Sequence, residues 1–88
     1  MTRQSVLDTA ATCVNGDRDH EYGSPENNFA KIAEFWTTYL QIDPALTPED
    51  VAMMMILLKV GRGTSKPDTW VDIAGYAACG GEIISGKI

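Results

Sequence analysis

The sequence has little of what marks several classes of protein. Its only cysteines, Cys13 and Cys79, stand far apart without the spacing of metal ligands, and we interpret them as small buried thiols. Basic residues are few, and the formal net charge is −5. A dedicated nucleic-acid binder would show a basic face, so we expect no DNA partner, although a local basic pocket for a small anion remains compatible with this charge.

Long hydrophobic runs are missing as well. The first residues lack the apolar stretch and cleavage pattern of a signal peptide, and the apolar run from Val51 to Val60 is too short to cross a bilayer. We therefore expect a cytoplasmic protein without a membrane partner. No strand pattern competes with the helical ones.

What the sequence does have is three helix starts. Ser24-Pro25-Glu26 and Thr47-Pro48-Glu49 each place an N-cap residue before a proline and an acid, and Ser65-Lys66-Pro67-Asp68 is a looser version. Apolar residues at helical spacing follow each start. The pattern predicts an all-α single domain spanning residues 1–88, with a short first helix within 1–15 and main helices over 24–41, 47–62 and 66–85.

The compositions of two of these helices indicate that they pack closely against other helices, a ligand or a partner subunit. The third is apolar nearly all round from Val51 to Val60, which is typical of a helix buried in a core or against a partner subunit. The fourth has a small-residue surface, so we expect close approach of another helix or a ligand, unless Gly80-Gly81 simply ends it early. Because 88 residues bury only a modest core, we expect a homo-oligomeric helix bundle, a dimer or higher.

Charged pairs mark the connection between the third and fourth helices. Lys59 and Arg62 stand one turn apart near the end of one, and Asp68 and Asp72 one turn apart at the start of the other. A short connection favours an antiparallel hairpin, which would bring the two pairs together. The pairs would form either an anion site or a salt-bridged hairpin, with Asp68 acting mainly as a capping-box acid.

Three segments together resemble a known family. "RDHEYGSPENNFAKIAEFW", "EDVAMMMILLKVGR" and "DTWVDIAGYAACGGE" are similar to short phage and prophage proteins of unassigned function, sometimes labelled MazG-like after all-α nucleoside triphosphate pyrophosphohydrolases. The resemblance runs from about Arg18 to Glu82 and implies a location in the host cytoplasm. MazG-type enzymes hold Mg²⁺ with an E-x-x-E pair and an E-x-x-D pair, but this chain contains no E-x-x-E.

The residues favour binding over hydrolysis. Two cations beside two carboxylates make a poor Mg²⁺ cage but suit a phosphate, and the segment before the helix over 24–41 adds groups for a base. We expect no cofactor and no catalytic residue. The predicted nucleotide-binding residues are Arg18, His20, Tyr22, Lys59, Arg62, Asp68, Trp70 and Asp72. For Trp36 and Trp70, a place in the core is the alternative.

Three hypotheses follow. The first is a protein that binds or sequesters a nucleotide or nucleotide signal without turnover, as a phage anti-defence sponge would. The second is a divergent MazG-like pyrophosphohydrolase with Mg²⁺ held by Glu49, Asp50, Asp68 and Asp72. The third is a non-enzymatic helical protein whose apolar third helix docks on a host protein.

Overall fold

The computed structural model describes residues 1–16 and 21–87, and the described residues are helical without any strand. The helices are α1 (Arg3–Asn15), α3 (Pro25–Leu40), α4 (Pro48–Gly61) and α5 (Pro67–Ser85). The predicted all-α class is confirmed, and each helix begins and ends within a residue or two of its predicted bounds. No helix in these ranges is long and apolar enough to cross a membrane.

The helix starts follow the predicted capping chemistry at two of the three prolines. The Ser24 hydroxyl accepts the Asn27 N–H at 3.3 Å, and Thr47 and Asp50 form a reciprocal capping box. At α5 the N-cap residue is Lys66, which makes no side-chain cap hydrogen bond. The capping-box role suggested for Asp68 is therefore wrong, and Asp68 is an exposed acid in the first turn of α5.

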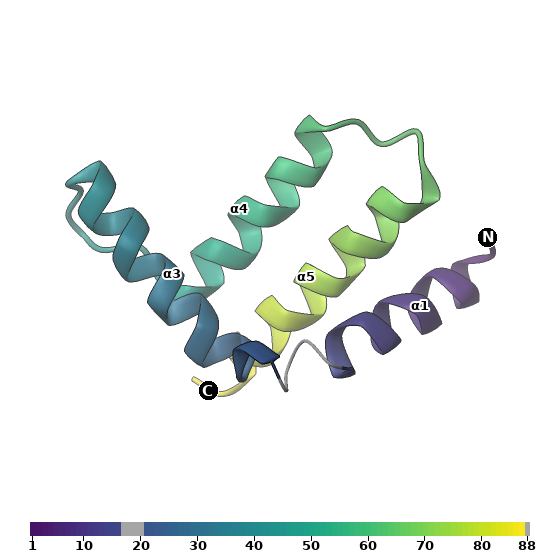
Figure 1. Cartoon of the computed structure of the whole chain (residues 1–88), viewed down its shortest axis with the longest axis horizontal. Helices are drawn as coiled ribbons and strands as arrows, with labels where there is room; N and C mark the ends of the chain where they lie inside the picture. Colours follow the sequence, from purple (N-terminus) through teal and green to yellow (C-terminus); the bar gives the residue numbers. More distant parts are fainter. Residues whose placement is uncertain (17–20, 88) are drawn as a thin grey trace.

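The α5 helix lies between α4 and α1 (Figure 1). The α4 and α5 helices form the predicted antiparallel hairpin, α1 packs along the other side of α5, and α3 packs mainly against α4 (Figure 1). The indole Nε1 of Trp70 donates to the Thr64 carbonyl at 2.9 Å across the α4–α5 loop. Trp70 is thus exposed at the end of the hairpin, contrary to the core alternative, whereas Trp36 packs against the core.

The core is small because each helix contributes few buried side chains. Its buried members are Phe29, Ala33, Val51, Ala52, Cys79 and Ile83. Cys79 is buried as predicted, but Cys13 is exposed, so the prediction of a buried thiol is wrong at that position. Only one face of α4 is buried within the chain, so its all-round apolar character is not explained by the core.

The small residues of α5 allow neighbouring helices to come close. A Cβ added at Gly75 would lie 3.2 Å from Val14 Cγ1 of α1, and one at Gly80 would lie 3.3 Å from Ala52 Cβ of α4. Close helix approach is therefore confirmed. The helix continues through Gly80 and Gly81 to Ser85, so the alternative of an early helix end is wrong.

Candidate functional site

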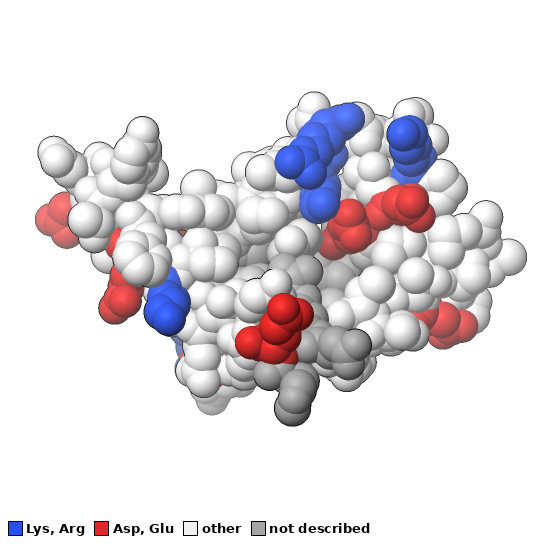
Figure 2. All heavy atoms as spheres, in the orientation of Figure 1, with Lys and Arg blue, Asp and Glu red and all other residues white. Residues whose placement is uncertain are grey.

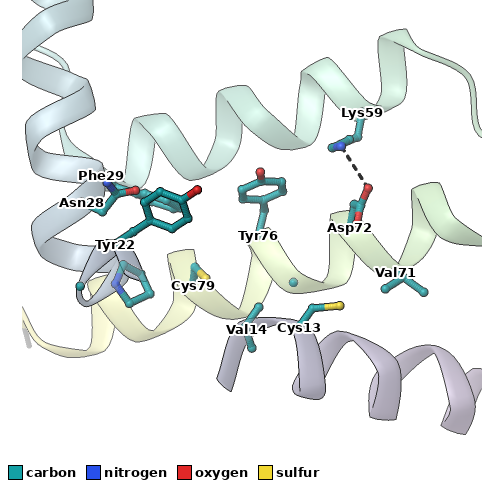
Figure 3. Close-up of a pocket in the computed structure, with 13 residues that line it drawn as sticks. Cys13, Val14, Tyr22, Asn28, Phe29, Lys59, Val71, Asp72, Tyr76 and Cys79 are labelled. Atoms are coloured by element: carbon teal, nitrogen blue, oxygen red, sulfur yellow. Dashed lines mark ion pairs between the residues drawn. The ribbon is translucent and has the colours of Figure 1, made fainter. Parts of the chain in front are cut away.

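A pocket of about 100 Å³ opens where all four helices meet, and we call it the interhelical pocket (Figure 3). Side chains from the end of α1, the start of α3, the end of α4 and the middle of α5 surround it. They are Cys13, Val14, Tyr22, Gly23, Pro25, Asn28, Phe29, Lys59, Val71, Asp72, Gly75, Tyr76 and Cys79. Most of these residues are apolar, and the polar groups stand at separate places on the wall.

The floor of the pocket is one face of α5. Asp72, Tyr76 and Cys79 follow each other at helical spacing, so they line the same side of this helix. The Tyr76 ring packs against Phe29 of α3, with the ring centroids 6.2 Å apart. Because Phe29 belongs to the core, this contact connects the Tyr76 ring to the core.

The ionic end of the pocket is the pair formed by Lys59 and Asp72. Lys59 Nζ lies 3.0 Å from Asp72 Oδ2, and the side chains are 19% and 44% exposed. An ammonium group has three N–H donors, and this single contact uses one of them. Lys59 can therefore meet an anionic oxygen in the pocket without giving up Asp72.

The aromatic end lies at the start of α3. Figure 3 shows the Tyr22 ring extending toward Tyr76, with the Asn28 side chain beside it. A tyrosine ring offers a stacking surface, and a carboxamide offers both a donor and an acceptor. This end suits a planar ring with a hydrogen-bonding edge.

The start of α3 contributes few backbone donors. Pro25 has no N–H, and the N–H groups of Asn27 and Asn28 already donate to the Ser24 side chain and carbonyl. Neither of these two N–H groups is therefore free to bind a phosphate. An anion in the pocket would depend on Lys59 instead.

The predicted site residues divide into three groups. Tyr22, Lys59 and Asp72 come together around the pocket, whereas Arg18 and His20 lie outside the described residues. Arg62, Asp68 and Trp70 are exposed near the α4–α5 loop and do not line the pocket.

Of the four charged residues expected to meet across the hairpin, only Lys59 and Asp72 form an ion pair with each other. Arg62 is the C-cap residue of α4, where the chain turns into the loop, and neither Arg62 nor Asp68 forms an ion pair with another described residue. Figure 2 shows cationic and acidic atoms side by side over this end of the hairpin, on the surface. These exposed charges neutralise one another through solvent and do not define a site.

The structure does not assemble the proposed magnesium ligands. Glu49 and Asp50 begin α4, while Asp68 and Asp72 lie in the first turns of α5. Because α4 and α5 are antiparallel, the two acidic pairs stand at opposite ends of the hairpin (Figure 1). Within residues 1–16 and 21–87, no three metal-ligating side chains gather in one place.

Sequence reasoning missed several residues of the pocket. Asn28 is not among the predicted site residues, yet it is half-buried at the aromatic end, and Cys13 was expected in the core but lines the pocket wall. Tyr76 carried a usable signal, since it stands one turn after Asp72 on the same helix face. Asn28 gave no comparable signal, because its position depends on how α3 crosses the hairpin.

The size of the pocket limits what it encloses. Sites for drug-sized ligands measure about 300–1,000 Å³, and a cavity of about 150 Å³ holds benzene. At about 100 Å³ the interhelical pocket is smaller than either, so it encloses a phosphate-sized group or part of one ring. A larger ligand would extend from its open mouth onto the surface.

Comparisons with known proteins place the chain among phage proteins. Residues 5–84 match the model of a family described as a domain of unknown function, DUF6378. The Gene 55 protein of Mycobacterium phage L5 is 47% identical over 76 residues, which are 83% of this chain and 48% of that protein. The Gene 55 protein of Mycobacterium phage D29 is 39% identical over 79 residues, which are 86% of this chain and 51% of that protein.

These matches confirm the resemblance to a short phage protein family and give no support to the MazG-like label. The chain spans about half the length of these curated relatives. No solved structure matches the chain.

Proposed function

Since the chain belongs to the DUF6378 family, whose description assigns no function, we propose from its own geometry that it binds a phosphate-bearing nucleotide without turning it over. One observation carries this proposal: Tyr22 and Asn28 at one end of a single pocket, and Lys59 at the other. The aromatic ring and amide suit a base, and the ammonium group suits a phosphate oxygen.

The Lys59–Asp72 pair supports binding of an anion at the ionic end. Lys59 is mostly covered, so its charge is less screened than that of a surface lysine, and Asp72 takes up only one of its three donors. Asp72 keeps the ammonium group in place when the ligand is absent. A nucleotide whose base lies against Tyr22 and Asn28 would extend its phosphate toward Lys59.

Binding without hydrolysis agrees with the distribution of acids. Phosphoryl chemistry of the MazG type needs carboxylates clustered around Mg²⁺, and the described acids are not clustered. Because the two Gene 55 relatives are phage proteins, sequestration of a host nucleotide signal is the role we propose for such binding. The pyrophosphohydrolase alternative makes the opposite prediction, that triphosphates are cleaved in the presence of Mg²⁺.

Calorimetric titration and thermal shift with mono-, di-, tri- and cyclic nucleotides in EDTA test the proposal. At least one nucleotide should bind, and Lys59→Met should weaken its affinity by about tenfold or more, because a charged hydrogen bond is lost. The matched control is Lys31→Met, since Lys31 is an exposed lysine of α3 that does not line the pocket. Tyr22→Leu and the exposed Tyr39→Leu form a second pair of the same kind.

Alkylation of Cys13 gives an independent readout of ligand position. This thiol is exposed and lines the pocket, so a bound nucleotide should slow its reaction with iodoacetamide. The absence of binding to every nucleotide would refute the proposal. Release of pyrophosphate with Mg²⁺ would refute binding without turnover and favour the enzyme alternative.

A further inference from the structure

The α4 helix has an outer face that no other described part of the chain covers. Met53, Leu57 and Val60 stand at i, i+4 and i+7, so they form one stripe, and they are 56%, 60% and 47% exposed. Val51 and Ala52, on the opposite side of the helix, are buried. We call the stripe the α4 outer face.

The total surface of the chain is larger than that of a closed monomer. A folded monomer of 9.6 kDa exposes on average about 5,100 Å², whereas this chain exposes 6258 Å². The excess of about 1,200 Å² exceeds the roughly 800 Å² that each partner buries in a standard protein interface. The radius of gyration, 13.6 Å, is likewise above the value of about 12 Å for a compact chain of this length.

The chemistry of the α4 outer face fits a second copy of the same chain. Between Asp50 in the first turn and Arg62 at the C-cap, the only charged residue of α4 is Lys59, which faces α5. In Figure 2 the surface over the middle of α4 likewise shows no charged atoms. Two copies with a net charge of −5 repel each other over most of their surface, but an uncharged apolar stripe meets itself without repulsion.

We infer that the protein forms a two-fold symmetric homodimer in which the outer face of α4 packs against the same face of a second copy. Leu57 lies at the centre of the stripe, and Met53 and Val60 flank it. In an isologous contact each of these residues is buried twice, once on each copy. Methionine adapts its shape to an apolar neighbour, so Met53 suits this interface. The inference does not depend on nucleotide binding.

Sedimentation velocity of the full chain at micromolar concentrations, with Leu57→Glu, tests the interface. The wild type should sediment as a dimer, and Leu57→Glu should weaken self-association by about 100-fold or more, because a carboxylate at the centre of an apolar contact lacks a partner. Leu7→Glu on α1 is the matched control, since Leu7 is 57% exposed and should leave the dimer intact. Circular dichroism of each variant establishes that its helices are formed.

A mixed sample of methyl-labelled and unlabelled protein locates the contact independently of any variant. Isotope-filtered nuclear Overhauser effects should connect the Met53 and Leu57 methyl groups of one copy to the α4 outer face of the other. A monomeric wild type would overturn the inference. So would a dimer that Leu57→Glu leaves intact, and so would one that dissociates on Phe35→Glu instead, because Phe35 is exposed on α3 outside the stripe.

Discussion

At the scale of single residues, ion pairs of this protein differ in what they do. Lys59 and Asp72 join two helices beside a pocket, whereas Lys87 and Glu49 join the C-terminal end of the chain to the start of α4. The Lys87 ammonium donates to both oxygens of Glu49, at 2.7 and 2.8 Å. This hydrogen bond lowers the pKa of Glu49 below its ordinary value of 4.5, since it favours the charged carboxylate.

The lowered pKa of Glu49 predicts a stability effect with a definite pH dependence. Because the folded state favours the carboxylate, the contribution is complete above the unfolded pKa and is lost as pH falls through the lower folded value. Lys87→Met should therefore reduce the melting temperature at pH 7, and this loss should become smaller at acid pH, as the pH falls through the folded pKa of Glu49. Lys31→Met serves as the control. An equal loss at pH 7 and at acid pH would show that the lysine stem, and not the ion pair, stabilises the protein.

The Lys59–Asp72 pair shows how far single residues could be predicted. Each interrupts an apolar run, and that signal correctly indicated a partner for both. A different argument, from one-turn spacing across the hairpin, failed for Arg62 and Asp68, which lie closer to the hairpin loop. Their positions at a C-cap and in a first helical turn leave them exposed, and sequence spacing alone does not report that difference.

At the scale of helices, most of the secondary structure could be predicted from the sequence. N-cap residues and prolines are local signals, so the starts of α3, α4 and α5 were predictable to a residue or so. The crossing of α3 over the hairpin was not predictable in this way, because it depends on how the side chains of Phe29 and Ala33 pack against those of Val51 and Ala52. The aromatic end of the pocket depends on that crossing, which is why Asn28 was missed.

The glycines of α5 give a prediction for the helix as a unit. A Cβ at Gly81 would meet no atom within 4 Å, so Gly81→Ala should raise the free energy of unfolding by about 0.5–1 kcal/mol through helix propensity. Gly80→Ala gains the same propensity but brings a Cβ to 3.3 Å from Ala52 Cβ, so it should stabilise less or destabilise. Urea denaturation measures both variants. A larger gain from Gly80→Ala would mean that α4 and α5 are not in close contact there.

At the scale of the whole molecule, a small core is combined with an open shape. The described chain buries few large side chains, and its longest dimension is 41 Å against 27 and 26 Å for the other two. A domain of this size is only marginally stable, and apolar surface on α4 adds nothing to the stability of a monomer. Association would remove that surface from water and stabilise the folded state.

Stability should therefore depend on protein concentration. If the folded protein is a dimer and the unfolded chain is a monomer, raising the concentration from about 1 to 100 μM should raise the melting temperature by about 5–10 °C. Differential scanning calorimetry at both concentrations measures the shift. Leu57→Glu should melt at a lower temperature that is the same at both concentrations, because its folded state is monomeric, while Leu7→Glu should keep the wild-type dependence. A wild type whose melting temperature does not change with concentration would show that the open shape belongs to a stable monomer, in which case the exposed α4 residues contribute nothing to folding.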